Sequence, residues 1–359
     1  IAMRPTIAWF VVVLLHASAS FASAQPTTEP VKTEPRIRRW LDVQSVHAGL
    51  RFRWYENSDD QLISSNLQWQ TQLRGRFLID RAGRYAINAF GSTGASFPSS
   101  WNNTGAGLGT WAGDLNVKQL FLAAEPVAGF QIEVGGLHFN RGEMFEHVTY
   151  DNDGFLVGER VTYRPVKGRL TQVSAAAGFF GGTDYDEVNV FKRFHRMNEF
   201  NYGQGLVAFS LHPLVSASVD YTYEDGRDIF REGVNVRMPS TVRLLTALRF
   251  EAYQRAADEN GSGFNISGEA RYRRYSLTAG IMSVDEHYGS PTGRPFNADR
   301  YETGTRQYTI HAFQLTEALQ LVVFQTEAFA TDFPVNIQRR VDALVTFNPT
   351  AWLKRKGVF

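Results

Sequence analysis

The sequence predicts an all-β protein: a transmembrane antiparallel β-barrel of about 16 strands, within a range of about 14–18, with short periplasmic turns and long extracellular loops. Three observations support this fold class. Apolar and polar residues alternate along many segments, as the side chains of a strand do when its faces meet different surroundings. The chain begins with the features of an export signal and contains no cysteine. No later stretch approaches the run of about 20 apolar residues that a transmembrane helix needs.

The first residues have the order expected of a secretory signal. Met3 is the expected initiator, Arg4 supplies the positive charge, and an apolar core follows at Ile7–Leu15. Ala22-Ser23-Ala24 matches a cleavage site, so residues 1–24 are predicted to be a signal peptide.

The remainder divides into a tail and one large domain. Residues 25–39 contain Pro26, Pro30 and Pro35, and they are predicted to form a flexible periplasmic tail. Residues 40–359 are predicted to form the barrel, because the alternation of strands continues through this region.

The clearest strand is predicted over Leu67–Ile79. One face carries Leu67, Trp69, Thr71, Leu73, Gly75, Phe77 and Ile79, and the other carries Gln68, Gln70, Gln72, Arg74, Arg76 and Leu78. One face is therefore apolar and the other polar and cationic, as expected of a wall between lipid and water.

Further strands follow from the same period of two residues. Regular alternation occurs at 46–54, 215–223, 242–250, 264–272 and 341–347. Three segments are less regular, namely Leu115–Ala124, Gly158–Arg164 and Ile229–Met238. Counting strands and the connections between them predicts about 16 strands with both termini in the periplasm.

The predicted connections are of two kinds. Short turns containing Gly or Pro, or otherwise tight, are expected at 80–83, 125–128, 165–168, 212–214, 239–240, 273–274 and 315–318. Long polar connections are expected at 96–113, 140–157, 181–202 and 286–305. At least one of the loops 140–157 and 181–202 is expected to fold into the barrel mouth. A soluble β-helix or sandwich is the alternative fold, but its connections should not sort by length.

The end of the chain leaves alternatives open. Val341–Phe347 is predicted to be a strand, and residues 348–352 resemble another turn. Residues 353–359 are expected to form a short closing strand or to precede a further hairpin, so a parent with about 18 strands is an alternative.

The predicted inner face is rich in arginine, which binds anions through a permanently charged, planar fork. The predicted pore-lining residues that set selectivity are Arg51, Arg53, Arg74, Arg76, Arg243, Arg249, Arg271 and Arg273. The predicted inward acids are Glu133, Asp220, Glu251, Glu269, Glu327 and Asp342. The alternative role for these charges is pairing across neighbouring strands, with Arg249–Glu251 and Glu269–Arg271 as candidate pairs.

One cationic patch is predicted to contain Arg51, Arg53, Arg74 and Arg76. Their two strands are adjacent in sequence, and neighbouring strands lie about 4.8 Å apart.

Other chemistry has little support in the sequence. Histidines and serines are scattered without a nucleophile motif, so no catalytic residues and no cofactor are predicted. The run 151–154 resembles part of a calcium loop, with Asp151 and Asp153 as candidate ligands. The distant glutamate of that motif is missing, so no metal site is predicted. Basic and acidic residues nearly balance, at 37 and 36, which gives no indication of nucleic-acid binding.

Part of the chain resembles a known family. Gly135–Gly142, followed by Tyr150–Phe155 and Val161–Tyr163, is similar to the central strand–loop–strand of alginate-export-like barrels. That family often has Arg-Gln where this chain has Leu137-His138, so individual substrate contacts are not transferred. The resemblance implies a monomeric barrel whose arginine-lined lumen passes anionic solutes or polysaccharide.

These observations predict a porin-like channel of the bacterial outer membrane. It is expected to pass small hydrophilic solutes with a mild preference for anions, through pore shape and lining charges rather than a reaction. The alternatives are a dedicated exporter of an anionic polysaccharide or organic anion, an outer-membrane enzyme, and a structural barrel with a blocked lumen. Expected partners are outer-membrane lipids, small hydrophilic or anionic solutes and the barrel-assembly machinery, but not nucleic acid. The oligomeric state stays open.

Overall fold

The computed structural model describes most of the predicted barrel domain. The described residues are 40–95, 114–144, 156–180, 189–224, 226–242, 244–256, 261–285, 304–330 and 337–357. The predicted signal peptide and periplasmic tail, residues 1–39, lie outside the described residues.

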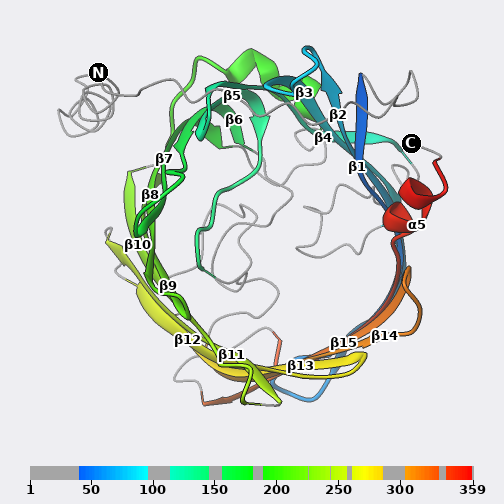
Figure 1. The fold of residues 1–359 in the computed structure, drawn as a ribbon. Coiled ribbons are helices and arrows are strands. Elements are labelled where there is room, and N and C mark those ends of the chain that lie inside the picture. The colour runs from blue at the N-terminus through cyan, green and yellow to red at the C-terminus, as the bar shows by residue number, and fades with distance from the viewer. Residues whose placement is uncertain are drawn as a thin grey trace. The chain divides into compact units, whose positions relative to one another are not determined.

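Sixteen antiparallel strands form one closed barrel, which confirms the predicted fold class and strand count (Figure 1). Each strand pairs with its neighbours in the chain, and β16 returns to pair with β1. The strands are β1 Leu41–Glu56, β2 Leu62–Leu78, β3 Tyr85–Ala95, β4 Asn116–Val127, β5 Phe130–Leu137, β6 Leu156–Tyr163, β7 Leu170–Phe180, β8 Tyr202–His212, β9 Val215–Glu224, β10 Arg227–Arg237, β11 Leu245–Ala256, β12 Gly261–Tyr272, β13 Tyr275–Val284, β14 Gly304–Gln314, β15 Leu319–Ala330 and β16 Arg339–Phe347. The described helical segments are α3 Val190–Arg193, η4 Phe194–Arg196 and α5 Thr350–Arg355.

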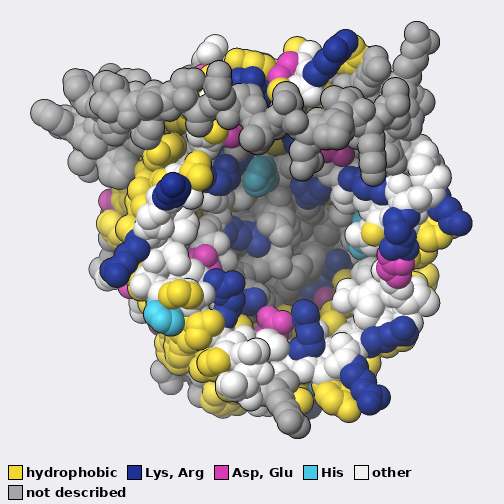
Figure 2. All heavy atoms as spheres, viewed as in Figure 1, with side chains coloured by type: hydrophobic (Ala, Val, Ile, Leu, Met, Phe, Trp, Pro, Cys, Tyr) yellow, Lys and Arg dark blue, Asp and Glu magenta, His cyan; other side chains and the backbone are white. Residues whose placement is uncertain are grey.

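The alternation read from the sequence corresponds to the two faces of the wall. On β2, Leu67, Leu73 and Phe77 are more than half exposed, at 69%, 53% and 51%, whereas Gln68 is only 2% exposed. Exposed large apolar residues recur on β1–β4 and β9–β16, and basic side chains gather along the central hollow (Figure 2). The outer surface is thus apolar and the inner surface polar, as the period of two requires.

The three irregular segments are also strands of the barrel. Leu115–Ala124 overlaps β4, Gly158–Arg164 overlaps β6, and Ile229–Met238 overlaps β10. A register shift in the β3–β4 ladder between Phe90 and Gly91 explains the weak alternation in β4, because such an irregularity inserts a residue and resets the period.

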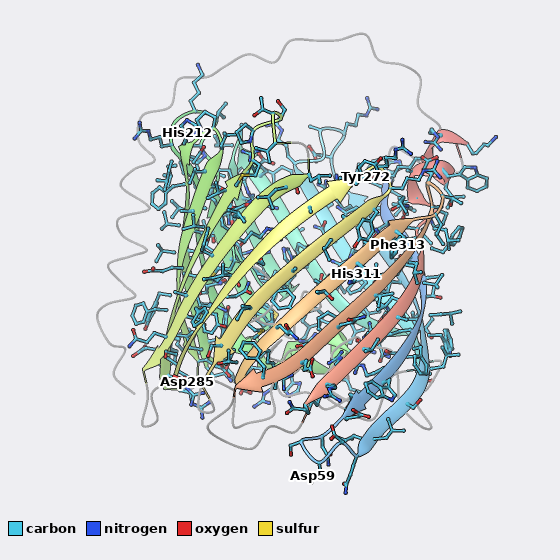
Figure 3. The ribbon with its side chains drawn as sticks, turned by 90° about the horizontal axis from the view of Figure 1, so that it is seen from below. Asp59, His212, Tyr272, Asp285, His311 and Phe313 are labelled. Carbon is cyan, nitrogen blue, oxygen red and sulfur yellow. The ribbon has the colours of Figure 1, made fainter. Side chains whose placement is uncertain are left out.

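The connections define two ends of the barrel. The turn end is the end that carries the connections β2–β3, β4–β5, β6–β7, β8–β9, β10–β11, β12–β13 and β14–β15, together with α5. The far end is the opposite one. Figure 3 shows His212 and Tyr272 at the turn end and Asp59 and Asp285 at the far end.

The prediction of a short closing strand after residue 352 is wrong, because Thr350–Arg355 forms helix α5. Pro349, which has no backbone N–H to give to a ladder, precedes this helix as its N-cap. The barrel is already closed by β16, whose last residue Phe347 pairs with Ala48 on one side and Leu319 on the other. Sixteen strands complete the wall, so no further hairpin is needed.

Helix α5 covers the edge of β1 that β16 leaves unpaired. β1 begins at Leu41, but its ladder with β16 begins only at Ala48. The Thr350 hydroxyl accepts a hydrogen bond from the Val46 N–H at 2.8 Å and donates to the Val46 carbonyl at 3.3 Å. Lys354 lies 3.5 Å from Asp42 on the same edge. The helix thereby protects an edge that would otherwise attract another strand.

A second contact of α5 reaches the β14–β15 turn. Arg355 forms a two-pronged ion pair with Glu317, and these hydrogen bonds hold the pKa of the Glu317 carboxyl below its usual range. Among the described residues, no helix is both long and apolar enough to span a membrane.

Replacing Thr350 by Val should destabilise the barrel at the seam, since the Val46 N–H and carbonyl lose their partner. We expect the free energy of unfolding in urea to fall by about 1–2 kcal/mol. Thr171→Val is the matched control, because Thr171 is exposed on β7. Equal effects of the two substitutions would contradict a capping role for Thr350.

Candidate functional site

The lumen wall is the candidate functional surface, and the strand register determines where its charges lie. In the β1–β2 ladder, Arg51 pairs with Gln68 and Arg74 pairs with Ser45. Arg74 therefore lies six positions beyond Gln68, on the order of 20 Å away at about 3.3 Å per residue. The predicted single patch of Arg51, Arg53, Arg74 and Arg76 is wrong, because antiparallel pairing places the two arginine pairs at different heights.

Arg53 belongs to a buried ion cluster across the seam of the barrel. Its guanidinium donates to both carboxylate oxygens of Asp342 on β16, at 3.0 and 3.2 Å. Arg340 donates to the same carboxylate at 2.7 Å, and all three side chains are almost fully buried. The cluster forms only because β1 and β16 meet, so the order of residues in the chain gave no sign of it.

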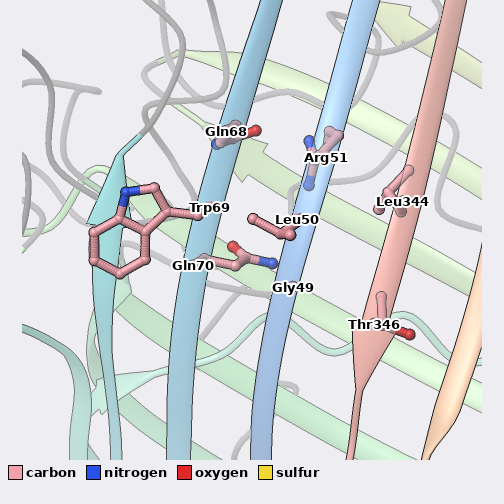
Figure 4. Close-up of a pocket in the computed structure, with 8 residues that line it drawn as sticks. All are labelled: Gly49, Leu50, Arg51, Gln68, Trp69, Gln70, Leu344 and Thr346. Carbon is pink, nitrogen blue, oxygen red and sulfur yellow. The ribbon is translucent and has the colours of Figure 1, made fainter.

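Arg51 lies beside this cluster and lines a pocket at the junction of β1, β2 and β16. Figure 4 shows Arg51 next to Gln68, with Gln70 and Thr346 on the flanking strands. Arg51 is 7% exposed and therefore lies in the shielded part of the wall.

Arg74 and Arg76 occupy the more open part of the inner wall, nearer the turn end. The Arg74 guanidinium lies 3.8 Å from the centre of the Phe90 ring and donates to Gln119 at 3.4 Å. Arg76 donates to the Gly83 carbonyl at 3.1 Å. Both arginines are half-buried, so water still reaches their charges.

Arg249 and Arg271 share one acid. Their guanidiniums lie 3.3 and 3.7 Å from Glu269, which confirms the predicted Glu269–Arg271 pair. Arg249 makes its ion pair with Glu269 and not with the predicted Glu251, whose carboxylate accepts a hydrogen bond from Asn265 at 3.1 Å.

Arg273 does not lie on the inner wall. It is in the two-residue turn between β12 and β13, and its guanidinium lies 5.3 Å from the centre of the exposed Tyr272 ring on the outer face. Glu327 also departs from its predicted inward position. Thr326 and Ala328 are buried, whereas Glu327 shares the outer face with exposed Phe329 and lies 2.8 Å from Arg339.

Three predicted residues cannot be placed. Arg243, Asp151 and Asp153 lie outside the described residues. Within the part of the chain that the structure describes, no group of three or more His, Asp or Glu side chains could hold a metal ion.

Two further buried ion pairs lie away from the seam, on β5–β6 and on β9–β10. Arg160 on β6 donates to Glu133 on β5 at 2.6 Å and to the His138 carbonyl at 2.6 Å. Arg231 on β10 donates to Asp220 on β9 at 2.8 Å. Glu133 and Asp220 have the inward positions that alternation predicted, but their partners depend on register, which a single sequence does not specify.

The segment after β5 folds inward, as expected for one of the two loops. Asn140 donates to Ser174 at 2.8 Å, and its carbonyl accepts from Gln204 at 2.7 Å. The Glu143 N–H donates to Ser218 at 2.7 Å. These wall residues lie on β7, β8 and β9, so residues 138–144 run along the inner wall and reduce the space in the lumen.

Residue Gly142 makes this path possible. Its φ of 59° lies in the left-handed region, and a Cβ there would approach the Ser218 hydroxyl to 2.6 Å. Any residue larger than glycine would push the segment off the wall.

The second of these two loops packs outside the barrel over its described residues 189–201, which agrees with the expectation that at least one of the two folds inward. Val190 is fully buried against Gly136, an outward-facing glycine on β5. The Arg196 guanidinium lies 3.7 Å from the centre of the Phe179 ring, and Phe200 stacks on the outward Tyr223 ring. The small outward residue Gly136 leaves space for Val190 of this segment. The alternation of polar and apolar residues does not predict such a contact.

Exposure of the inner wall differs between the two halves of the lumen. On β16, Arg340 and Asp342 are buried, whereas Leu344 and Thr346 nearer the turn end are half-buried. β1 shows the same change, since Arg53 is 1% exposed and His47 is half-buried. Solvent therefore reaches the turn-end half of the wall more freely, and the tighter half is nearer the far end.

No protein-family profile matches the chain, and no curated protein matches its sequence. Among solved structures, a mutant of Rhodopseudomonas blastica porin aligns with a TM-score of 0.55 at 11% identity, over 86% of this chain and 99% of that chain. Salmonella typhi OmpF in complex with daunomycin aligns with a TM-score of 0.56 at 9% identity, over 88% of this chain and 100% of that chain. At these identities the comparison shows that the chain has a porin-like fold.

Replacing Asp342 by Asn should destabilise the protein strongly, because the charges of Arg53 and Arg340 would lose their buried counter-ion. We expect the free energy of unfolding to fall by about 3–5 kcal/mol. Glu269→Gln is the control, since that carboxylate is partly solvated and its loss should cost about 1 kcal/mol or less. If the two variants lose equal free energy of unfolding in urea, the seam cluster contributes no more to stability than the partly solvated Glu269 pair.

Proposed function

We propose that this protein is a channel of the bacterial outer membrane through which small hydrophilic solutes diffuse, rather than an enzyme. The observation that carries the proposal is the closed antiparallel wall with an apolar outer surface and a charged inner surface. In such a wall, neighbouring strands satisfy all the backbone N–H and C=O groups between them. The apolar outer side chains can contact lipid, and the polar inner side chains surround an aqueous passage. The porin-like fold of the solved structures supports the same conclusion.

The narrower part of the proposal is a mild preference for anions. Inward cations are more numerous than inward acids among the described residues. The inward cations include Arg51, Arg53, Arg74, Arg76, Lys118, Arg160, Arg231, Arg249, Arg255, Arg306 and Arg340, and the inward acids include Glu133, Asp220, Glu224, Glu251, Glu269 and Asp342. Fixed positive charge along a water-filled wall concentrates anions near it.

Arg74 and Arg76 are the residues proposed to contribute most to this preference. They remain half-exposed in the more open half of the lumen, whereas Arg160 and Arg231 are each buried with a carboxylate. A charge in contact with water acts on passing ions, whereas a buried pair is nearly neutral from a distance.

A dedicated exporter of an anionic polysaccharide or organic anion is the second candidate. The resemblance of Gly135–Gly142 to alginate-export-like barrels and the excess of inward arginine favour it. The inward segment 138–144 carries part of that resemblance and lies in the lumen, where a solute would pass. In this proposal, residues 1–24 serve as the export signal, residues 25–39 form a periplasmic tail, and the assembly machinery inserts the barrel.

The purified chain should produce stepwise current increments in a planar lipid bilayer. In a salt gradient, the reversal potential should indicate a modest preference for anions. Replacing Arg74 and Arg76 together by Glu should shift the reversal potential toward cation selectivity, because four units of charge change on one side of the lumen.

The double replacement of Arg81 and Arg84 by Glu provides the control. These arginines lie at the β2–β3 turn, so the same change in net charge occurs outside the lumen wall. Absence of current steps would contradict the channel. A cation-selective wild type, or equal shifts in both double variants, would contradict the role of Arg74 and Arg76.

A further inference from the structure

The outer surface at the β12–β13 turn combines two cations with exposed aromatic rings. Arg273 and Arg274 form the turn itself, and both side chains are exposed. The Arg273 guanidinium lies over the Tyr272 ring, 5.3 Å from its centre. Arg274 donates to the Leu315 carbonyl of the next turn at 3.2 Å. Neither guanidinium has an ion pair with an acid among the described residues.

The backbone of this turn is unusual for its sequence. Arg273 has a φ of 54°, in the left-handed region where two-residue hairpin turns strongly prefer Asn, Asp or Gly. A long side chain in this conformation costs about 1 kcal/mol or more in backbone strain. Strain of this kind persists where the residue that carries it has a role, and at this exposed turn the side chain is the part that can supply one.

An aromatic surface adjoins the two cations on the outer face. Tyr272, Phe313 and Leu315 are 57%, 38% and 47% exposed. The Tyr275 ring lies 4.8 Å from Phe313, and its hydroxyl hydrogen-bonds to His311 at 2.9 Å. Figure 3 shows Tyr272 at the turn end of the barrel, with Phe313 and then His311 farther from that end. This arrangement has an apolar part toward the middle of the barrel and a cationic part at its rim.

Three acids at the turn end are already engaged, and one of them, Glu317, lies in the neighbouring β14–β15 turn. Asp42 lies 3.5 Å from Lys354, Glu317 pairs with Arg355, and Asp80 accepts the Tyr85 N–H at 2.9 Å. The charge at the β12–β13 turn therefore remains available for an anion from outside the protein.

We propose that Arg273 and Arg274 bind the headgroup phosphate of an anionic phospholipid, while Tyr272 and the Tyr275–Phe313 pair contact its glycerol and upper acyl chains. The planar guanidinium fork matches phosphate oxygens. Aromatic rings at the boundary between apolar and polar regions suit the lipid interface. A lipid headgroup accounts for both parts of the surface, whereas a free phosphate ion would use only the cations.

This inference rests on the membrane placement in the proposed function. It adds a defined lipid site in the leaflet at the turn end, with a negatively charged headgroup as its ligand. The site is separate from the lumen, because Tyr272 and Arg273 lie on the outer face.

The test uses the full chain reconstituted in phosphatidylcholine vesicles that contain trace spin-labelled lipid. The relative association of spin-labelled phosphatidylglycerol and spin-labelled phosphatidylcholine is measured by electron spin resonance. The variant combines Arg273→Gly with Arg274→Gln, since glycine suits the positive φ and keeps the turn able to fold. Its preference for phosphatidylglycerol should fall by roughly fivefold or more.

The control combines Lys167→Gln with Arg169→Gln. These cations lie in the β6–β7 turn at the same end of the barrel and are also exposed, and the same net charge is removed. The control should retain the wild-type preference, and added inorganic phosphate at constant ionic strength should not abolish it.

Three results would overturn the proposed site: an unchanged preference in the Arg273/Arg274 variant, equal losses in both variants, or displacement of the lipid by inorganic phosphate. Failure of the wild type to incorporate into vesicles would contradict the membrane placement as well. Incorporation without a headgroup preference would contradict the lipid site alone.

Discussion

The pairing of β1 with β16 is the constraint on which the rest of the structure depends. A flat sheet of sixteen strands would leave two edges of unpaired N–H and C=O groups, which lipid cannot satisfy. The ladder from Ala48–Phe347 to Glu56–Arg339 removes most of both edges, and Thr350 of α5 satisfies Val46 beyond it. Closure also separates the lumen from the outer surface, so each strand has one face toward the lumen and one face toward the outside.

Closure explains why the charges of the inner wall divide into two groups. Near the far end, arginines are buried and share carboxylates with neighbouring strands, as in the Arg53–Asp342–Arg340 cluster. These groups hold the wall together, and segment 138–144 packs against the middle of β7 and β9. Nearer the turn end, Arg74, Arg76 and Arg249 remain in contact with solvent. Structural pairing thus involves the buried arginines, and the proposed attraction of anions is assigned to Arg74 and Arg76, which still contact solvent.

The strands and their faces could be predicted from the sequence because a period of two is a local property. Register and closure are not local, so the sequence placed Arg51 and Arg74 in one patch and did not reveal the contact of Arg53 with Asp342. Arg273 continued the alternation of β12 in the sequence, but the chain turns there and its side chain moves to the outer face. The outward path of residues 189–201 depends on packing against Gly136, which alternation cannot detect.

The central claim is that one face of each strand meets lipid and the other meets water. Single cysteines at Trp69 and Phe250 on the outer face, and at Gln70 and Arg249 on the inner face, test it directly, because the chain has no native cysteine. In intact outer membranes, the account predicts that a lipid-soluble thiol reagent labels the first two positions and a small charged aqueous reagent labels the other two. Labelling of all four positions by the aqueous reagent, or the reverse pattern, would contradict the barrel as a membrane channel.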